Sequence, residues 1–368
     1  MTQPKPPFRA DVVGSLLRPA AIKQARQQWL ADEIDAAQLR EVEDREILHA
    51  VERQKAVGLQ VVTDGEFRRS WWHFDFFEGL EGVEGYEADH GIQFNGIQTK
   101  SRSIKVTGKV GFNPRHPMLD DFRYLNSIAG DAAAKMTIPS PSVLHFRGGR
   151  AAIDSTVYPT LDAYFDDLAQ TWQDAIQAFY DAGCRYLQLD DTVWSYLCSE
   201  DQKRQIRERG EDPEVLASTY ARVLNQALAN KPADLVIGLH VCRGNFRSTW
   251  IAEGGYEPVA STLFGGVNVD EFFLEYDTER AGGFEPLRFI RPGHQQVVLG
   301  LITTKTGELE AVADVEKRIA EAAQYVALDQ LCLSPQCGFA STEEGNTLSE
   351  AEQWEKLKRV VEIAKRVW

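Results

Sequence analysis

Eight short segments rich in Val, Ile and Leu recur along this chain of 368 residues, and most precede a stretch with helical periodicity. The strand candidates are residues 11–14, 59–63, 135–138, 185–190, 235–240, 268–275, 297–302 and 330–333. The helical candidates include residues 36–56, 161–181, 214–229, 308–326 and 349–367. Such alternation is typical of a parallel sheet covered by helices. Eight strand-helix units predict an α/β fold, and specifically a (β/α)8 TIM barrel.

The longest interruption of this alternation, residues 67–134, falls between the second and third predicted strands. It contains an aromatic run at residues 71–77 and a predicted hairpin over residues 101–110 around Gly108. An insertion of this length favours a lid or rim structure. The aromatic run is interpreted equally well as the core of the inserted part. Because no internal repeat or linker divides the chain, residues 1–368 are predicted to form one catalytic domain.

The charge balance restricts the partners of the protein. Its 55 acidic and 40 basic residues give a net charge of −15, whereas nucleic acids and anionic membranes bind through basic patches. No apolar run approaches the ~20 residues of a membrane helix, and the first residues lack the apolar region of a signal peptide. Five cysteines without a paired spacing predict no disulfide framework. We expect a cytoplasmic protein with small-molecule substrates and no nucleic-acid or membrane partner; a homo-oligomer is compatible with these features.

The fifth predicted strand ends in a pair of potential metal ligands. His240 and Cys242 are two residues apart, and side chains at positions i and i+2 of a strand point the same way. Imidazole and thiolate are both ligands that Zn²⁺ prefers in tetrahedral sites. The pair therefore predicts half of a zinc site, which needs two further ligands from other parts of the fold.

Two other predicted strand ends carry suitable groups. Glu275 ends the sixth predicted strand, and Cys337 follows the eighth. In a barrel the carboxyl ends of all strands face one mouth, so these residues and the His240–Cys242 pair are predicted to bind Zn²⁺ together. The competing interpretation is a buried core histidine with two unrelated thiols.

The predicted ligand set indicates the chemistry. Two thiolates and one carboxylate leave zinc with one excess negative charge, which makes it a poor activator of water. Zinc also keeps an added thiol deprotonated at neutral pH, where a free thiol of pKa ~8.5 is mostly protonated. The set therefore favours alkylation of a bound thiol over hydrolysis, and Glu275 is the natural ligand to yield when that thiol arrives.

Polar groups at further strand ends predict a binding site for an amino acid. Glu66 and Asp190 are positioned to grip an ammonium group, and the backbone N–H groups near Ser15 to receive a carboxylate. The alternative is that Glu66 pairs with Arg68 or Arg69 and that Asp190 or Asp191 caps a helix. Because groups at barrel mouths are generally functional, we predict that Glu66 and Asp190 contact the substrate and serve catalysis.

Six short motifs resemble cobalamin-independent methionine synthase, and in particular the short single-barrel relatives of its C-terminal half. The motifs are VVGS at 12–15, VTDGE at 62–66, LQLDD at 187–191, LHVCRGN at 239–245, the strand-end Glu275 and SPQCG at 334–338. The resemblance spans essentially the whole chain, and the four potential zinc ligands are its most specific part.

The resemblance implies roles for individual residues. His240, Cys242, Glu275 and Cys337 would bind zinc, while Ser15, Glu66 and Asp190 would hold the amino-acid end of homocysteine. A methyl group would pass from a methyltetrahydrofolate or another methyl donor to the zinc-bound thiolate, forming methionine. The family carries a histidine after the seventh strand, where this chain has residues 303–305 as Thr-Thr-Lys, so the sequence leaves the donor open.

Two other functions fit parts of the pattern. Related barrels alkylate coenzyme M, but Glu66 and Asp190 would repel its sulfonate and favour an ammonium group. A zinc-binding protein without catalysis is the third candidate. Structural zinc sites usually contain only nitrogen and sulfur ligands, so the carboxylate of Glu275 argues against that function.

Overall fold

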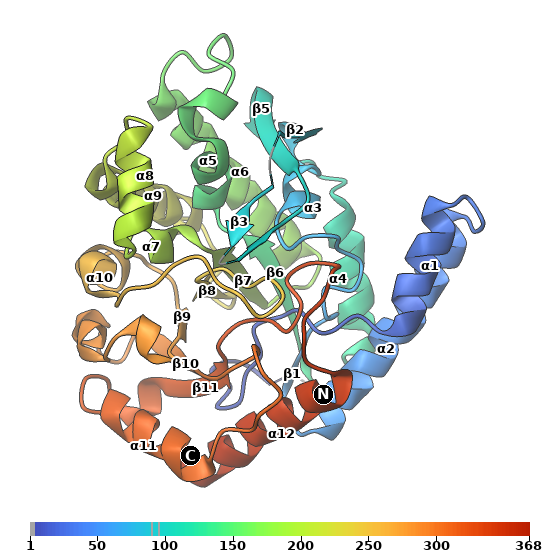
Figure 1. Ribbon diagram of the computed structural model, residues 1–368, viewed down its shortest axis with the longest axis vertical. Helices are drawn as coiled ribbons and strands as arrows, with labels where there is room; N and C mark the ends of the chain where they lie inside the picture. Colours follow the sequence, from blue (N-terminus) through green and yellow to red (C-terminus); the bar gives the residue numbers. More distant parts are fainter. Residues whose placement is uncertain (1–3, 90, 95) are drawn as a thin grey trace.

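Seven parallel strands form the central sheet of the protein. The computed structural model describes residues 4–89, 91–94 and 96–368. The strands pair in chain order, as traced in Figure 1. They are β1 (Val61–Val62), β6 (Ala133–Pro139), β7 (Tyr186–Asp191), β8 (Val236–Val241), β9 (Glu271–Glu275), β10 (Gln296–Ile302) and β11 (Leu331–Pro335). The protein thus has a mixed α/β fold whose curled parallel sheet is TIM-barrel-like.

The prediction of eight strands was wrong by one, because residues 11–14 do not form a strand. This segment still lies beside β11, where a single parallel bridge joins Ala10 to Leu333. On its other side the backbone N–H of Leu16 donates to the carbonyl of Gly65 at 3.0 Å, just after β1. The first segment therefore runs between the two edge strands without forming a regular ladder with either.

Side chains take the backbone groups that such a ladder would use. The ammonium group of Lys135 donates to the carbonyl of Val12 at 2.5 Å, and Gln188 donates to the carbonyl of Val13 at 2.8 Å. Thr63 donates to the carbonyl of Gly14 at 2.6 Å. Because buried backbone groups need one partner each, these contacts satisfy the segment without a strand partner.

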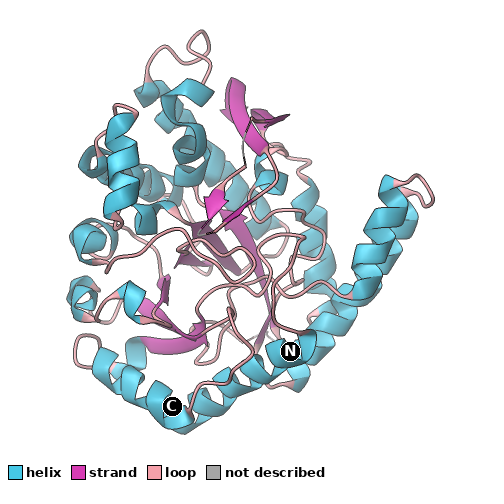
Figure 2. Ribbon diagram, viewed as in Figure 1, coloured by secondary structure: helices cyan, strands magenta, loops and turns pink. Residues whose placement is uncertain are grey.

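Helices surround the strands, as Figure 2 shows in cyan around magenta. The predicted helices at 36–56 and 161–181 are confirmed as α2 (Ala36–Ala56) and α6 (Leu161–Asp181). Three more predicted helices are confirmed with ends displaced by a few residues, as α9 (Pro213–Leu228), α11 (Val312–Ala322) and α12 (Glu350–Val367). The remaining α-helices are α1 (Ala20–Leu30), α3 (Phe74–Phe77), α4 (Pro117–Ile128), α5 (Pro141–Gly148), α7 (Val193–Tyr196), α8 (Glu200–Glu208) and α10 (Glu257–Leu263).

Local chemistry explains where these helices begin and how they pack. The Ser349 hydroxyl accepts the backbone N–H of Glu352, and the Glu352 carboxylate accepts the backbone N–H of Ser349, so α12 begins with a capping box. Helix α6 buries one face, including Tyr164, Leu168 and Trp172. The inner strands are buried on both faces, as expected for a parallel sheet covered by helices.

The segment between β1 and β6 contains two small antiparallel sheets. Strand β2 (Glu81–Glu87) pairs with β5 (Arg102–Gly111), and β3 (Gln93–Phe94) pairs with β4 (Ile97–Gln98). The β2–β5 pair lies at the end of the molecule opposite α11 and α12 (Figure 1). Helix α4 instead packs against β6 and α2, so it joins the outer layer of helices.

The predicted hairpin turn around Gly108 was wrong, because Gly108 lies inside β5. The register of β2 and β5 shifts near this point, between Glu81 and Val83. Gly82 has a φ of +73°, and a Cβ on it would lie 2.3 Å from the carbonyl oxygen of Lys109. The glycines near the shift therefore allow two backbones to approach closely, and they do not form a turn.

Most of the aromatic run at residues 71–77 is buried. Trp71, Phe74, Phe76 and Phe77 are each at most 4 % exposed, and Phe76 packs on Trp172 of α6 with ring centroids 5.6 Å apart. These side chains anchor the inserted segment to the barrel. Among the residues that the structure describes, no helix is both long and apolar enough to cross a membrane.

Candidate metal centre

The ends of three strands, β8, β9 and β11, deliver the four predicted metal ligands. His240 is the penultimate residue of β8, and Cys242 follows that strand directly. Glu275 is the last residue of β9, and Cys337 comes two residues after the end of β11. Because parallel strands end at one edge of the sheet, the four side chains converge there.

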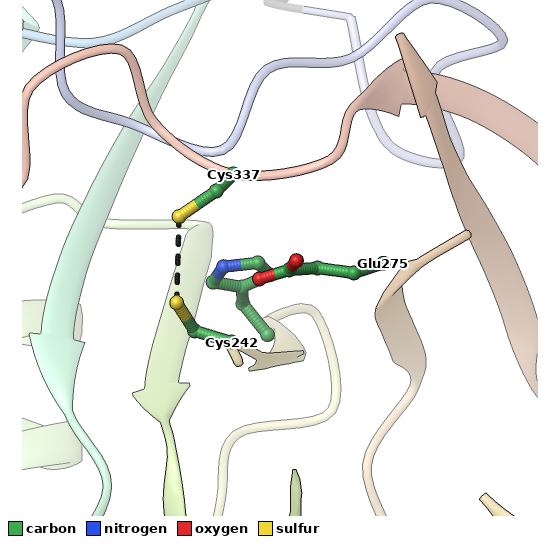
Figure 3. Close-up of side chains that lie close together, drawn as sticks. Cys242, Glu275 and Cys337 are labelled. Carbon is green, nitrogen blue, oxygen red and sulfur yellow. Dashed lines mark hydrogen bonds between the residues drawn. The ribbon is translucent and has the colours of Figure 1, made fainter. Parts of the chain in front are cut away.

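The four potential ligand atoms lie within 4.8 Å of one another, and all four residues are buried. The sulfur atoms of Cys242 and Cys337 are 3.5 Å apart. Figure 3 shows these two thiols facing each other, with the carboxylate of Glu275 reaching toward them from another strand. The predicted juxtaposition of these residues is confirmed.

The electrostatics of the two cysteines favour a thiolate. The hydrogen bond between them lowers the pKa of Cys337 well below its usual range, and the same contact raises the pKa of Cys242. The contact between the two sulfurs therefore favours one thiolate in the pair. A thiolate is the form in which cysteine binds a metal.

The imidazole of His240 is the strongest sign that the cluster fits a cation. The side chain is 2 % exposed, and neither ring nitrogen has a hydrogen-bond partner among the described residues. A buried polar nitrogen without a partner costs free energy. One nitrogen, two sulfurs and one carboxylate oxygen match the ligands and the number that Zn²⁺ takes.

Two donors hold the carboxylate of Glu275 in place. The backbone N–H of Arg243 donates to its Oε1 at 2.8 Å, and the guanidinium of Arg280 donates to its Oε2 at 3.0 Å. Burial raises the pKa of Glu275, while the charges of Lys305 and Arg280 counter that rise. The carboxylate of Glu275 therefore has hydrogen-bond partners within the protein, independent of any bond to a metal.

The residues predicted to bind substrate line the same pocket as the metal cluster. Ser15, Glu66 and Asp190 lie along its wall with His240 and Cys242. Asp190 pairs in register with His240 across β7 and β8, which explains their proximity. The structure thus brings together every residue for which the sequence predicts a role, and the contacts of Ser15, Glu66 and Asp190 with substrate stay predictions.

Glu66 and Asp190 are two buried acidic residues whose negative charges are only partly balanced by neighbouring groups. Thr137 donates to Oε1 of Glu66 at 2.9 Å, whereas Oε2 has no hydrogen bond among the described residues. Arg69 forms an ion pair with that oxygen at 3.8 Å, too long for a hydrogen bond, so the predicted alternative pairing of Glu66 with Arg69 is present as an ion pair. Burial raises the pKa of Glu66, and burial together with the Glu66 charge raises the pKa of Asp190 to about 7. A ligand cation between them would lower both pKa values.

Asp191 has a structural role. Its Oδ1 accepts the backbone N–H of Val193 at 2.6 Å at the start of α7, and its Oδ2 accepts from Ser142. The helix-capping alternative is therefore confirmed for Asp191. The carboxylate of Asp190 instead accepts from Gln188 at 2.6 Å and lines the pocket.

The chain around Cys337 passes close to Ser15. The Oγ of Ser15 accepts the backbone N–H of Ala340 at 3.2 Å. A Cβ on Gly338 would lie 2.0 Å from that Oγ, so glycine is the residue that fits directly after the potential ligand Cys337. The Cys-Gly pair in the sequence is the local signal of this close approach.

Several pocket residues were missed in the sequence because they do not end strands. Thr192 and Tyr196 come from the region of α7, and Phe94 comes from the inserted β3. The sequence signal for Phe94 is the length of the insertion, which predicts a lid or rim structure. Phe94 at the pocket supports that interpretation.

Comparison with known proteins places these observations in a family. Residues 8–366 match the family described as "Cobalamin-independent synthase, Catalytic domain". An uncharacterised Bacillus subtilis protein, YxjH, is 57 % identical over 366 residues, covering 100 % of this chain and 96 % of YxjH. A methionine synthase of Sulfolobus acidocaldarius is 23 % identical, covering 89 % of this chain and 84 % of that protein.

A solved structure from Listeria monocytogenes is also similar. That protein, provisionally described as a vitamin-B12-independent methionine synthase, is 48 % identical with a TM-score of 0.81, covering 100 % of this chain and 99 % of the other. Its similarity extends over the barrel and the segment between β1 and β6 alike. The chain belongs to the cobalamin-independent methionine synthase family.

Proposed function

We propose that this protein is a zinc-dependent methyltransferase that methylates the thiol of homocysteine to give methionine. The observation that carries the proposal is the cluster of His240, Cys242, Glu275 and Cys337. Three of these residues, all but Glu275, line one pocket together with the acidic residues Glu66 and Asp190. The proposal agrees with the family to which the chain belongs.

The four ligand residues would hold Zn²⁺, which when bound keeps an incoming thiol deprotonated at neutral pH. Cys242, Cys337 and His240 supply the softer ligand atoms and stay in place. Glu275 supplies the carboxylate, the ligand that yields most readily. The backbone N–H of Arg243 and the guanidinium of Arg280 donate to its two oxygens, so these bonds would hold the carboxylate even if it did not bind the metal.

Glu66 and Asp190 would bind the ammonium group of the acceptor, and the backbone near Ser15 its carboxylate. Oε2 of Glu66 accepts no hydrogen bond, and the pKa values of both acids are raised, which supports a cation-binding role for the pair. A sulfonate such as that of coenzyme M would meet repulsion from the same pair. The acceptor is therefore a thiol that carries an amino group.

The methyl donor is a methyltetrahydrofolate or another methyl compound. In the transfer a bond forms between the acceptor sulfur and the methyl carbon while the bond from that carbon to the donor breaks. The donor keeps the bonding electron pair. The chain contributes by orienting the sulfur and by excluding water, since every potential ligand residue is buried.

Isothermal titration of the zinc-loaded protein with homocysteine and with coenzyme M tests the acceptor. We expect homocysteine to bind and to shift the X-ray absorption edge of zinc, because sulfur replaces oxygen as a ligand. Tighter binding of coenzyme M would overturn the choice of acceptor. A bound metal whose edge does not change with homocysteine would indicate a structural zinc site and no catalysis.

Assays of methionine formation address the donor directly. 5-Methyltetrahydrofolate in mono- and polyglutamyl forms, methylcobalamin and S-adenosylmethionine are compared with the same zinc-loaded protein. We expect one of them to support turnover that depends on both zinc and homocysteine. Turnover that persists after complete removal of zinc would contradict the proposed role of the metal.

A further inference from the structure

One buried cation near the metal cluster has no role in the proposed function. Lys305 lies three residues after β10, the strand between β9 and β11, and 8 % of its surface is exposed. Its ammonium group donates to Oδ1 of Asn245 at 3.5 Å. No carboxylate in the described part of the chain lies within 4.0 Å of that group. A buried charge without a paired ion is unfavourable, so the position of this lysine needs a physical reason.

Asn245 connects the ammonium group of Lys305 to both cysteine segments. It lies three residues after Cys242, and its amide group donates to the carbonyl of Gly338 at 2.7 Å, directly after Cys337. Asn245 also lines the pocket that contains both cysteines. The Lys305 ammonium is thus one hydrogen-bonded side chain away from that pocket.

The segment that carries Lys305 is held in place by the neighbouring strand ends. On the β11 side, the backbone N–H of Thr304 donates to the side-chain oxygen of Gln336 at 2.6 Å. On the β9 side, the hydroxyl of Thr303 donates to Asp277 at 2.9 Å. Because bonds on both sides fix this segment, the charge of Lys305 has a defined position relative to the potential ligands at the ends of β9 and β11.

The charge of Lys305 acts on three of the four potential ligands. Burial raises the pKa of Glu275, and the charge of Lys305 opposes that rise more than the charge of Arg280 does. The contact between the two cysteines lowers the pKa of Cys337 and raises that of Cys242, and in both residues the Lys305 charge favours the thiolate. The lysine is therefore a shared counterion of these groups, placed beyond hydrogen-bond distance from them.

The balance of charge in the proposed site gives such a counterion a function. Two thiolates and one carboxylate exceed the charge of a divalent cation by one. An acceptor thiol that binds as a thiolate releases its proton to solvent, so it adds a second excess negative charge. A fixed cation nearby lowers the free energy of that added charge.

We propose that Lys305 is a positioning residue that balances the charge of the metal centre and so lets the acceptor bind as a thiolate. The inference rests on the proposed function and deepens it, because it names a residue that acts on the acceptor without touching it. Lys305 acts through its fixed positive charge, and Asn245 holds that charge in place.

The affinities for homocysteine and for zinc should respond differently to removal of this charge. Zinc-loaded Lys305→Met should bind homocysteine ~10–100-fold more weakly in isothermal titration, the effect of one charge at an effective dielectric constant of ~20. Competition with a chromophoric chelator measures zinc affinity, which should be at least that of the wild type, because a cation beside the site repels Zn²⁺. Unchanged homocysteine affinity would overturn the inference, and weaker binding of both ligands would show a merely structural role.

Two further variants separate charge from packing and hydrogen bonding. Lys305→Gln keeps a donor for Asn245 but carries no charge, so it should bind homocysteine as weakly as Lys305→Met does. Lys100→Met is the control for net charge, since Lys100 is exposed and pairs with Glu343 at 2.7 Å; it should bind homocysteine as the wild type does. Wild-type affinity in Lys305→Gln, or an equal loss in Lys100→Met, would contradict the assignment.

The wild type separates this inference from the proposed function. Homocysteine should bind to the zinc-loaded wild type and shift the X-ray absorption edge of zinc. A wild type that binds no homocysteine would overturn the proposed function. Binding with that edge shift at equal affinity in the wild type and both Lys305 variants would leave the proposed function intact and overturn the role of Lys305.

Discussion

At the scale of single residues, the four potential metal ligands are distinguished by the convergence of their ligand atoms within 4.8 Å. His240, Cys242, Glu275 and Cys337 are the group of potential ligands in the described part of the chain. Cys332, by contrast, behaves as a core residue: it is fully buried, and burial raises its pKa. Burial alone therefore does not distinguish a ligand thiol, and the position after a strand end does.

Cys337→Ala should lose most of the bound zinc and all methyl transfer, because three ligands hold the metal more weakly than four. Metal content measured by elemental analysis after dialysis checks this. Cys332→Ala is the matched control, since it removes a buried thiol from the preceding strand and should keep the metal. Full zinc occupancy in Cys337→Ala would exclude it as a ligand.

Asp190→Asn should keep zinc but bind homocysteine ~10–100-fold more weakly, because an amide cannot balance the charge of an ammonium group. Isothermal titration with homocysteine and metal analysis on the same sample give both values. Loss of the metal in this variant would show that the division between ligands and substrate contacts is incorrect.

At the scale of elements, side chains outside the strands position the pocket. Asp191 links the start of α7 to Ser142 of α5, so one buried carboxylate connects the two helices that carry Arg147 and Tyr196. The sequence predicted α2 and α6 to the residue because long amphipathic patterns define a helix locally. It did not predict α7, whose four residues form no period of their own.

Asp191→Ala should lower the free energy of unfolding by ~1–3 kcal/mol, because the buried N–H of Val193 and the hydroxyl of Ser142 lose their partner. Urea denaturation measures the change. Asp35→Ala removes an exposed cap at the start of α2 and should cost ~1 kcal/mol. If the two variants lost equal stability, burial of the Asp191 contacts would contribute nothing.

At the scale of the whole molecule, a polar network fills the barrel interior near the opposite ends of the strands. The hydroxyl of Tyr186 lies 2.6 Å from carboxylate oxygens of both Asp11 and Glu271, and Lys135 stands 3.1 Å from Asp11. One hydroxyl proton cannot serve two carboxylates, so one acid is protonated. Burial raises the pKa of Glu271 to about 8, with the Asp11 charge adding to the rise.

This network should make stability fall as pH rises. Glu271 holds its proton in the folded protein up to about pH 8, whereas in the unfolded chain it releases it near pH ~4.3. The unfolded state therefore binds fewer protons between these values, and its relative free energy falls as pH increases. The stabilising effect of protonated Glu271 is complete below pH ~4.3 and is lost by about pH 8.

Glu271→Gln should remove this part of the pH dependence, since an amide does not titrate in the window. The free energy of unfolding is measured for both proteins from pH 5 to 9, and the difference between them should shift in favour of the variant as pH rises. Parallel curves for the two proteins would show that Glu271 is ionised in the fold.

The sequence by itself determined the parallel α/β class, most helices and the four potential metal ligands, because strand periodicity and strand-end position are properties of short stretches of chain. Tertiary structure decided that residues 11–14 form no strand, because their carbonyl groups accept hydrogen bonds from the side chains of Lys135, Gln188 and Thr63. It also decided that Asp191 caps a helix while Asp190 faces the pocket. Those outcomes depend on contacts between distant parts of the chain, and no local pattern in the sequence encodes such contacts.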